Sequence, residues 1–239
     1  MCLILFCISP DAEHRLVVAA NRDELYARPT SRPAFWEAAP EVLAGRDLQA
    51  GGTWLGVSRN GRFAAVTNFR ETAVEPLPPL SRGALTADFL RSTESCADYI
   101  KRITPQADQY RGFNLLIDDG KETSYYSNRT TSARRLTAGY YGLSNQLLDC
   151  NWPKVMRGRA DLNDVGQSGF STEALFGLLA NRGDDSPFSA RFIESDSYGT
   201  SASTVVKIMH NNLVVFEERA FLANGEPAAS ACFHFSTDD

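Results

Sequence analysis

Apolar residues in this chain fall into short runs separated by polar turns, a pattern typical of β-strands. The run at 1–8 is continuous and rich in Leu, Ile and Phe, which predicts a strand buried on both faces. A second apolar run covers 15–20, and the polar stretch between them contains Pro10. Two strands joined by so short a loop predict an antiparallel hairpin. Paired residue numbers then sum to about 23 or 24, which sets Cys2 beside Asn21 or Arg22.

The same pattern predicts further hairpins, helices and irregular segments along the chain. Asn60-Gly61 is a two-residue hairpin signal, and its register would pair Thr53 with Asn68. Other strands are predicted at 113–117, 122–127, 140–144, 203–210, 213–221 and 231–235. Helices are predicted over 81–92, 94–104, 152–162 (with Asn151 as the cap) and 171–181. Irregular structure is predicted for 26–47, 71–79 and 182–198, and a solvated loop for 129–135.

This order of elements favours an α+β fold. Strand hairpins precede two helices, and further strands precede two more helices and a last hairpin. Such an order fits two antiparallel sheets with helices outside them. No repeat, low-complexity segment or linker interrupts the sequence, so we expect a single domain over 1–239.

Composition narrows the range of functions. The net charge is −5 and the pI about 5.3, which disfavours a nucleic-acid partner. The five cysteines are an odd number without a CxxC motif, which argues against a disulfide framework or a zinc site and for a reducing compartment. The three histidines are far apart in sequence. We therefore expect neither a bound metal nor an obligatory cofactor.

The apolar start differs from a signal peptide because it lacks a basic region and stops after residue 8. No other apolar run approaches the ~18 residues that a transmembrane helix needs. We therefore expect a cytoplasmic protein without a transmembrane segment.

Cys2 is the leading candidate for chemistry. A residue as small as Cys at position 2 favours removal of Met1, which would leave a thiol and a free α-amine on one residue. That pair can act as nucleophile and base. Arg22 would lower the thiol pKa, making Cys2 the most reactive of the cysteines, and Asp23 could hold the ammonium group. The alternatives are a buried core cysteine and a solvated polar turn.

Several motifs carry a resemblance to a known family. Asn21-Arg22-Asp23-Glu24 follows a Met1-Cys2 start. Later motifs are Gly51-Gly52-Thr53-Trp54-Leu55-Gly56, Thr67-Asn68-Phe69, Ser81-Arg82-Gly83, Gly112-Phe113-Asn114-Leu115, Tyr141-Gly142-Leu143-Ser144-Asn145 and Tyr198-Gly199-Thr200. On this set the chain is identified as a member of the NRDE family, also called the transport and Golgi organisation protein 2 family.

That family resembles the N-terminal nucleophile (Ntn) hydrolases of the penicillin V acylase and bile salt hydrolase group. The resemblance implies a four-layer αββα sandwich and a cysteine amidohydrolase acting on a small amide or other C–N bond. It also implies that Asn145 and Asn68 form an oxyanion hole, with Phe69 lending its backbone N–H. Each Asn could instead be an ordinary strand-end turn residue.

Further residues are candidates for substrate contact. We expect Asn21, Phe69 and Arg82 to contact the substrate, with Arg82 at a helix start that could bind an anion. The alternative for Arg82 is a solvent-exposed side chain.

Two features of this sequence weigh against catalysis. Arg22 and Asp23 are adjacent, so on a strand they would point to opposite faces. Ser201 stands where the family usually has an Arg. The alternative function is a non-enzymatic carrier of haem or another apolar ligand, since the family has been connected with haem handling and membrane traffic. The sequence offers no clear axial ligand for haem.

Overall fold

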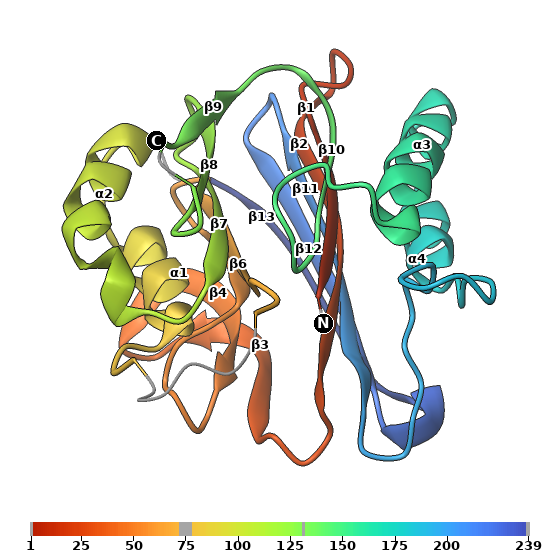
Figure 1. Ribbon diagram of the computed structural model, residues 1–239. Helices are drawn as coiled ribbons and strands as arrows, with labels where there is room; N and C mark the ends of the chain where they lie inside the picture. Colours follow the sequence, from red (N-terminus) through yellow and green to blue (C-terminus); the bar gives the residue numbers. More distant parts are fainter. Residues whose placement is uncertain (1, 72–77, 131, 238–239) are drawn as a thin grey trace. The chain divides into compact units, whose positions relative to one another are not determined.

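The computed structural model describes residues 2–71, 78–130 and 132–237 (Figure 1). The chain divides into two compact units. Unit 1 contains Met1–Arg28, Ala138–Ser144 and Leu148–Ser236, and unit 2 contains Pro29–Thr137, Asn145–Leu147 and Thr237–Asp239. Each unit holds one antiparallel sheet and two α-helices, so the predicted α+β class is confirmed.

Unit 1 is built on a six-stranded sheet in the order β10-β1-β2-β11-β12-β13. Its strands are β1 (Leu3–Ile8), β2 (His14–Leu25), β10 (Gly139–Leu143), β11 (Tyr198–Met209), β12 (Leu213–Phe221) and β13 (Pro227–Ser236). β1 and residues 16–20 of β2 are buried because both faces of each segment are apolar, and β2 continues with the buried polar residues Asn21, Arg22 and Asp23.

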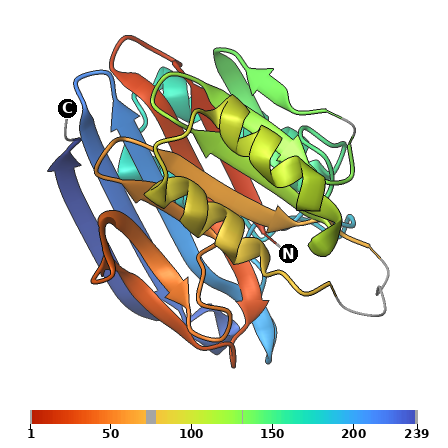
Figure 2. The ribbon, with the colours of Figure 1, turned by 90° about the vertical axis from the view of Figure 1, so that its left-hand side faces the viewer.

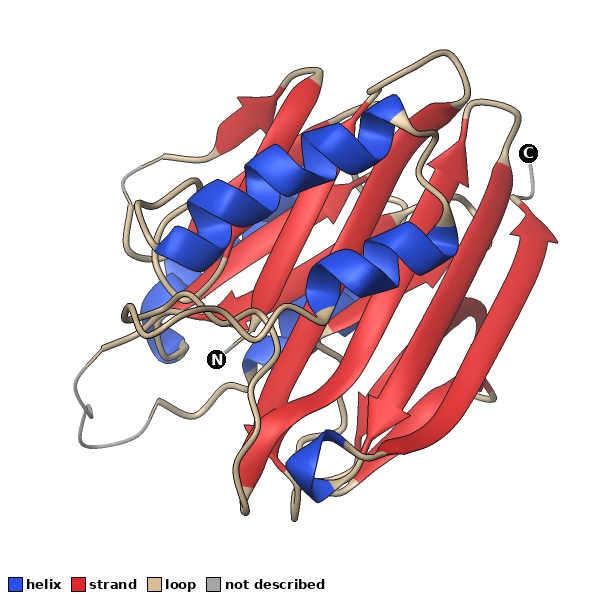
Figure 3. Cartoon of the chain, turned by 90° about the vertical axis from the view of Figure 1, so that its right-hand side faces the viewer, coloured by secondary structure: helices blue, strands red, loops and turns tan. Residues whose placement is uncertain are grey.

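Two helices, α3 (Pro153–Gln167) and α4 (Thr172–Leu179), pack on one face of this sheet (Figure 3). Leu3, Leu5 and Cys7 of β1 join Leu162 and Leu175 in their shared core. Odd-numbered residues of β1 therefore face the helices, and even-numbered ones face the other way.

The starts of these helices differ from each other. The hydroxyl of Ser171 caps α4 by accepting from the backbone N–H of Ala174 at 3.2 Å. The cap of α3 is Trp152, followed by Pro153 in the first turn, and not Asn151 as expected.

Unit 2 is built on a seven-stranded sheet in the order β3-β4-β5-β6-β7-β8-β9. Its strands are β3 (Thr30–Trp36), β4 (Ala39–Asp47), β5 (Leu55–Ser58), β6 (Phe63–Asn68), β7 (Phe113–Asp118), β8 (Thr123–Ser127) and β9 (Arg134–Leu136). The helices α1 (Arg82–Arg91) and α2 (Cys96–Ile103) lie across it (Figure 2).

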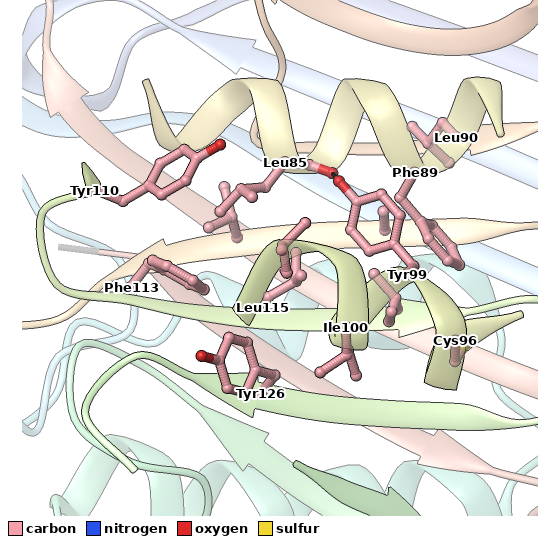
Figure 4. Close-up of a cluster of buried hydrophobic side chains, with 14 of the residues drawn as sticks. Leu85, Phe89, Leu90, Cys96, Tyr99, Ile100, Tyr110, Phe113, Leu115 and Tyr126 are labelled. Atoms are coloured by element: carbon pink, nitrogen blue, oxygen red, sulfur yellow. Dashed lines mark hydrogen bonds between the residues drawn. The ribbon is translucent and has the colours of Figure 1, made fainter. Parts of the chain in front are cut away.

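The core of unit 2 is aromatic. Phe89 and Tyr99 meet edge to face, with ring centroids 5.0 Å apart, between the helices and the sheet (Figure 4). The Tyr99 hydroxyl donates to the backbone carbonyl of Leu85 at 2.5 Å, so its one polar group is satisfied within the core and ties α2 to α1.

One predicted hairpin register is confirmed and one is wrong. In the first hairpin Leu3 pairs with Asn21, which is the register sum of 24 that loop length predicted. In the hairpin at Asn60 the pairs run Val57 with Phe63 and Leu55 with Ala65, one residue away from the expected alignment. Gly61 has φ +71° and its neighbours close a three-residue loop, so the turn holds one residue more than the Asn-Gly signal suggested.

The segment 26–47 is not irregular as expected, because it forms β3 and β4. Pro33 is tolerated because β3 is the edge strand and its pairing shifts between Ser31 and Ala34. A short strand, β9, likewise replaces part of the loop predicted at 129–135. The loop predicted at 71–79 falls largely on 72–77, outside the described residues.

Among the described residues, no helix combines the length and the apolar character needed to cross a membrane.

Two glycines explain why α1 can start so close to the sheet of unit 2. A Cβ placed on Gly52 would lie 2.4 Å from the carbonyl carbon of Gly83, inside van der Waals contact with backbone. The Thr53 N–H donates to the Gly83 carbonyl at 3.2 Å, so the two chain segments are hydrogen-bonded as well as packed.

Gly52→Ala should therefore lower the free energy of unfolding by about 1–3 kcal/mol, because backbone cannot yield as a flexible side chain would. The matched control is Gly177→Ala in α4, where a Cβ meets nothing within 4 Å and which should gain about 0.5–1 kcal/mol from helix propensity. Urea denaturation of both variants measures the difference. Equal stability of Gly52→Ala and wild type would contradict this account of the contact.

Candidate active site

Cys2 lies at the start of β1, the strand that β10 and β2 flank in unit 1. Cys2 is 9% exposed, and its backbone carbonyl accepts a 2.6 Å hydrogen bond from the Ser144 hydroxyl. Continuing the strand register by one residue from the Leu3–Asn21 pair sets Cys2 opposite Arg22. The structure therefore brings Cys2 to the Asn-Arg-Asp-Glu segment, as the hairpin predicted.

The ionisation of Cys2 differs from our expectation. Burial raises the pKa of the Cys2 thiol above its ordinary value, and the nearby Asp23 carboxylate raises it further. The charge of the N-terminal amine opposes this rise most, followed by the Asp23 backbone N–H, which hydrogen-bonds the sulfur, and the Arg22 charge, but together they do not overcome it. Arg22 therefore lowers the pKa of the Cys2 thiol as expected, but the cost of burying a thiolate is the larger effect, and the net pKa is raised.

Asn21 is a structural brace. Its side-chain amide donates to the carbonyls of Leu179 at 3.0 Å and Arg191 at 2.8 Å, and its oxygen accepts from the Ser203 hydroxyl at 2.6 Å. Because both amide hydrogens are used within the protein, Asn21 ties β2 to β11 and to the end of α4. The expected contact of Asn21 with substrate stays a prediction, and it would have to be made without these two amide hydrogens.

Arg22 pairs with the residue that departs from the family pattern. Its guanidinium donates to the Ser201 hydroxyl at 3.2 Å, and that hydroxyl donates to the Arg22 carbonyl at 3.1 Å. The pairing of β2 with β11 shifts between Thr200 and Ala202, so Ser201 is the extra residue of a β-bulge. Glu24 lies 3.6 Å from the same guanidinium.

Asp23 is held by Thr200 in the same bulge region. The Thr200 hydroxyl donates to the Asp23 carboxylate at 2.8 Å and accepts from the Ile193 N–H at 2.9 Å, which fixes its direction. Burial raises the pKa of Asp23 to about 6, against the lowering effects of the Lys154 charge and the Thr200 bond. A buried carboxyl that titrates near neutrality beside a thiol is a feature of catalytic sites.

Lys154 was not among the candidates predicted from the sequence. It is the second residue of α3, is 1% exposed, and interacts electrostatically with Asp23, Cys2 and Cys150. A lysine directly after Pro153 at a helix start was the available signal, because a cation in the first turn opposes the helix dipole.

The remaining candidates, Asn68, Phe69, Arg82 and Asn145, lie in unit 2, where they belong to two hydrogen-bonded groups. The Asn145 amide donates to the Asn68 carbonyl at 2.8 Å, and the Asn145 carbonyl accepts from the Arg70 N–H at 2.7 Å. Asn145 is buried and the residue Asn68 is exposed. The two Asn residues that the resemblance paired are therefore neighbours within this unit.

Phe69 and Arg82 converge on a single acceptor. The backbone N–H of Phe69 donates to the Gly112 carbonyl at 2.8 Å, and the Arg82 guanidinium donates to the same oxygen at 3.1 Å. The Phe69 N–H, expected to stabilise an oxyanion, is thus bonded to backbone. Arg82 is half-buried and reaches back to the loop before β7, so it is not the solvent-exposed side chain that was the alternative, and its contact with an anion stays a prediction.

A separate cavity of about 570 Å³ lies in unit 1 between α4 and the strands β12 and β13. Phe176, Phe192 and Phe221 make it largely apolar, and Ser203 and Arg219 contribute polar groups. Cys2, Arg22 and Asp23 do not line it, and Asn21 reaches its wall only through Ser203.

Comparisons with known proteins agree on family and fold. The family model of Transport and Golgi organisation 2 matches residues 1–223. The Transport and Golgi organization 2 homolog of Mus musculus is 32% identical over 93% of this chain and 94% of its own length. The homolog of Bos taurus is 33% identical over 94% of both chains, and the Drosophila melanogaster protein is 27% identical over 91% of both.

Solved structures show the fold. An N-acylethanolamine-hydrolyzing acid amidase ortholog from Caenorhabditis elegans superposes with a TM-score of 0.56 at 12% identity, over 86% of this chain and 92% of that one. A mutant of conjugated bile acid hydrolase from Clostridium perfringens gives 0.55 at 9% identity, over 99% and 92%. Both are Ntn-hydrolase-type enzymes, and at these identities the likeness concerns the fold alone.

Asp23 generates a prediction about pH and stability. Its pKa is raised from 3.8 to about 6, so the folded chain binds this proton more tightly than the unfolded chain. That contribution to stability is complete below pH 3.8 and is lost as the pH rises through about 6. Asp23→Asn keeps an oxygen for Thr200 and removes the titration. From about pH 4 to about pH 7, the unfolding free energy of wild type should therefore fall relative to the variant by up to about 3 kcal/mol.

Urea denaturation across this range measures the effect. Glu218, whose pKa burial raises to about 7, titrates in both proteins and cancels in the difference. A difference independent of pH would show that Asp23 titrates as an ordinary carboxyl.

The exposure of the cysteines predicts the order in which they react with iodoacetamide. Cys232 is the exposed cysteine, its sulfur 3.4 Å from the His234 ring, whereas Cys2, Cys7 and Cys96 are buried. In protein that retains Met1, a short iodoacetamide pulse should label Cys232 first and Cys2 much more slowly, the reverse of the order expected from the sequence. Mass mapping of peptides decides it. Faster labelling of Cys2 would show that its thiol is more ionised than its burial implies.

Proposed function

The chain belongs to the Transport and Golgi organisation 2 family, and from that premise we propose that it is a cysteine amidohydrolase. Its substrate would be a small amide or a related C–N compound, and Cys2 its nucleophile. The observation that carries the proposal is the pairing of Cys2 with Asp23, whose backbone N–H bonds the sulfur and whose carboxylate is fixed by Thr200. The proposal places the protein in the cytoplasm, in keeping with five free cysteines.

The proposed reaction begins with removal of Met1, because the Cys2 nitrogen is otherwise a peptide amide and cannot serve as a base. The free α-amine takes the proton of the thiol, and the sulfur attacks the substrate carbonyl carbon. The C–N bond then breaks as the ammonium returns its proton to the leaving amine, and an acyl thioester remains. Water attacks the thioester, releases the acid and restores the thiol.

Each group of the Cys2 site has a role in this proposal. The Asp23 carboxylate holds the α-ammonium while the sulfur attacks, and Thr200 keeps the carboxylate in place. Arg22 is turned to Ser201 and Glu24 and acts as part of the scaffold. The oxyanion role of Asn145 and Asn68 stays an expectation that rests on the family resemblance alone.

A second candidate function is the carriage of an apolar ligand, which the cavity beside α4 favours. Its volume of about 570 Å³ and its phenylalanine walls fit the usual size and lining of a small-molecule site. The described residues that line it include no His, Cys, Met or Tyr, the usual axial ligands of haem. The cavity therefore fits an apolar ligand better than a haem held by a metal bond.

The proposal predicts that hydrolysis depends on Cys2 and on the absence of Met1. Cys2→Ser keeps the shape of the site and exchanges a strong nucleophile for a weak one, so kcat should fall about 10³-fold or more. The control is Cys232→Ser, an exposed change that should leave kcat unaltered. Fluorogenic N-acyl amides of short and long chain, with intact mass to verify the N-terminus, provide the assay.

Two outcomes would overturn the proposal. One is full activity in protein shown by mass to retain Met1, and the other is no hydrolysis of any amide by Met1-free wild type. If the second outcome comes with binding of an apolar dye that a cavity variant such as Phe176→Asp abolishes, the carrier function is favoured instead.

A further inference from the structure

Lys154 is a buried lysine whose amine makes no hydrogen bond, within the described residues, that would stabilise the fold. It follows Trp152, whose ring stacks on Phe188 with centroids 4.3 Å apart, and its backbone N–H donates to the Phe188 carbonyl at 2.9 Å. The Lys154 amine lies 5.9 Å from the Trp152 ring centroid. These contacts fix the first turn of α3 and cover the lysine side chain.

The Lys154 amine has no hydrogen-bond partner among the described residues. Burial of an unpaired ammonium is costly, and its place in the first turn of a helix adds repulsion from the helix dipole. An apolar side chain of the same length would avoid both penalties. The fold alone therefore gives no reason for a lysine here.

Arg191 is another buried cation beside α3, and unlike Lys154 it has hydrogen-bond partners. The Arg191 guanidinium pairs with the Asp161 carboxylate of α3 and donates to the Leu178 carbonyl at 3.1 Å. Unit 1 thus supplies local partners to Arg191. The Lys154 amine, by contrast, has no such partner in the described part of the chain and interacts electrostatically with Asp23 first, and then with Cys2 and Cys150.

We propose that Lys154 is a positioning residue of the Cys2 site, supplying the positive charge that balances the Cys2 thiolate. This rests on the proposed function insofar as it assigns Lys154 to a nucleophilic thiol. With Asp23 ionised and Lys154 protonated, the resting site has no net charge. When the thiol proton moves to the α-amine, the thiolate is balanced by Lys154 and the new ammonium by Asp23, and no other proton moves.

The direction of Arg22 strengthens this assignment. Its guanidinium donates to Ser201, lies near Glu24, and interacts with the buried Glu218 carboxyl. Arg22 thus interacts with the carboxyl groups of Glu24 and Glu218. Burial lowers the pKa of Lys154, and the charges of Asp23 and Cys2 act in the opposite direction and raise it. The ionisation of Lys154 is therefore coupled to that of Asp23 and Cys2.

The test compares Lys154→Met with Lys207→Met in Met1-free protein. Met keeps the length of the side chain and removes the charge. Lys207 is the matched control because it lies in β11 of the same unit, with its amine 3.5 Å from the Phe170 carbonyl. The measurement is the iodoacetamide labelling rate of Cys2 as a function of pH, by peptide mass mapping, together with thermal unfolding.

In Lys154→Met, the curve of Cys2 labelling rate against pH should shift to higher pH by about one unit or more. Near neutral pH this shift is a loss of about tenfold in the labelling rate. Thermal unfolding serves here to show that the variant is folded, because the gain from removing a buried ammonium is offset by leaving the Asp23 carboxylate without its balancing charge. Lys207→Met should leave the Cys2 profile unaltered. If Lys154→Met does not fold, Lys154→Gln, which keeps a polar end without charge, serves for the same measurement.

The proposal is overturned if the Cys2 profile of a folded Lys154 variant matches wild type, or if Lys207→Met shifts it equally. Labelling requires no turnover, so it separates this inference from the proposed function. A shifted profile in a protein that hydrolyses no amide retains the role of Lys154 and rejects the amidohydrolase. An unshifted profile in an active hydrolase rejects the role of Lys154 alone.

Discussion

Unit 1 depends on β2 being hydrogen-bonded along both of its edges. Leu3 of β1 and Ser203 of β11 both pair with Asn21, so the position of this one residue is set from two sides. Because side chains alternate along a strand, a slip of one residue would exchange the faces of Asn21, Arg22 and Asp23 together. The brace, the scaffold arginine and the buried carboxyl therefore keep their separate surroundings only while both registers hold.

The parts of the fold that could be predicted were those set by local rules. Loop length gave the β1–β2 register, and apolar spacing gave α1 to α4. The hairpin at Asn60 was misaligned because a glycine with positive φ can close a two-residue or a three-residue loop. The strands β3 and β4 were missed because proline is excluded from central strands but tolerated at a sheet edge, and a single sequence does not say which strand is the edge.

The candidate site was predictable to the same extent. The hairpin brought Cys2 to Asp23, but the pKa of Cys2 follows from its burial, which depends on residues distant in sequence. Lys154 was overlooked for a related reason: nothing near it in sequence indicates that its amine interacts electrostatically with Asp23 and Cys2. Asn21 looked available for a ligand because its partners, Leu179 and Arg191, lie far along the chain.

The reciprocal hydrogen bonds between Arg22 and Ser201 couple the two positions energetically. A serine fits the bulge because its hydroxyl can accept from the guanidinium and donate to the carbonyl of the same residue. Replacing Ser201 by alanine would remove both bonds at once, whereas replacing Arg22 removes only the bond that its guanidinium donates. The effects of substitutions at 22 and 201 on stability should therefore not add: Ser201→Ala should cost less in a chain whose Arg22 side chain is already gone. The two positions form one energetic unit, although they lie 179 positions apart in the sequence.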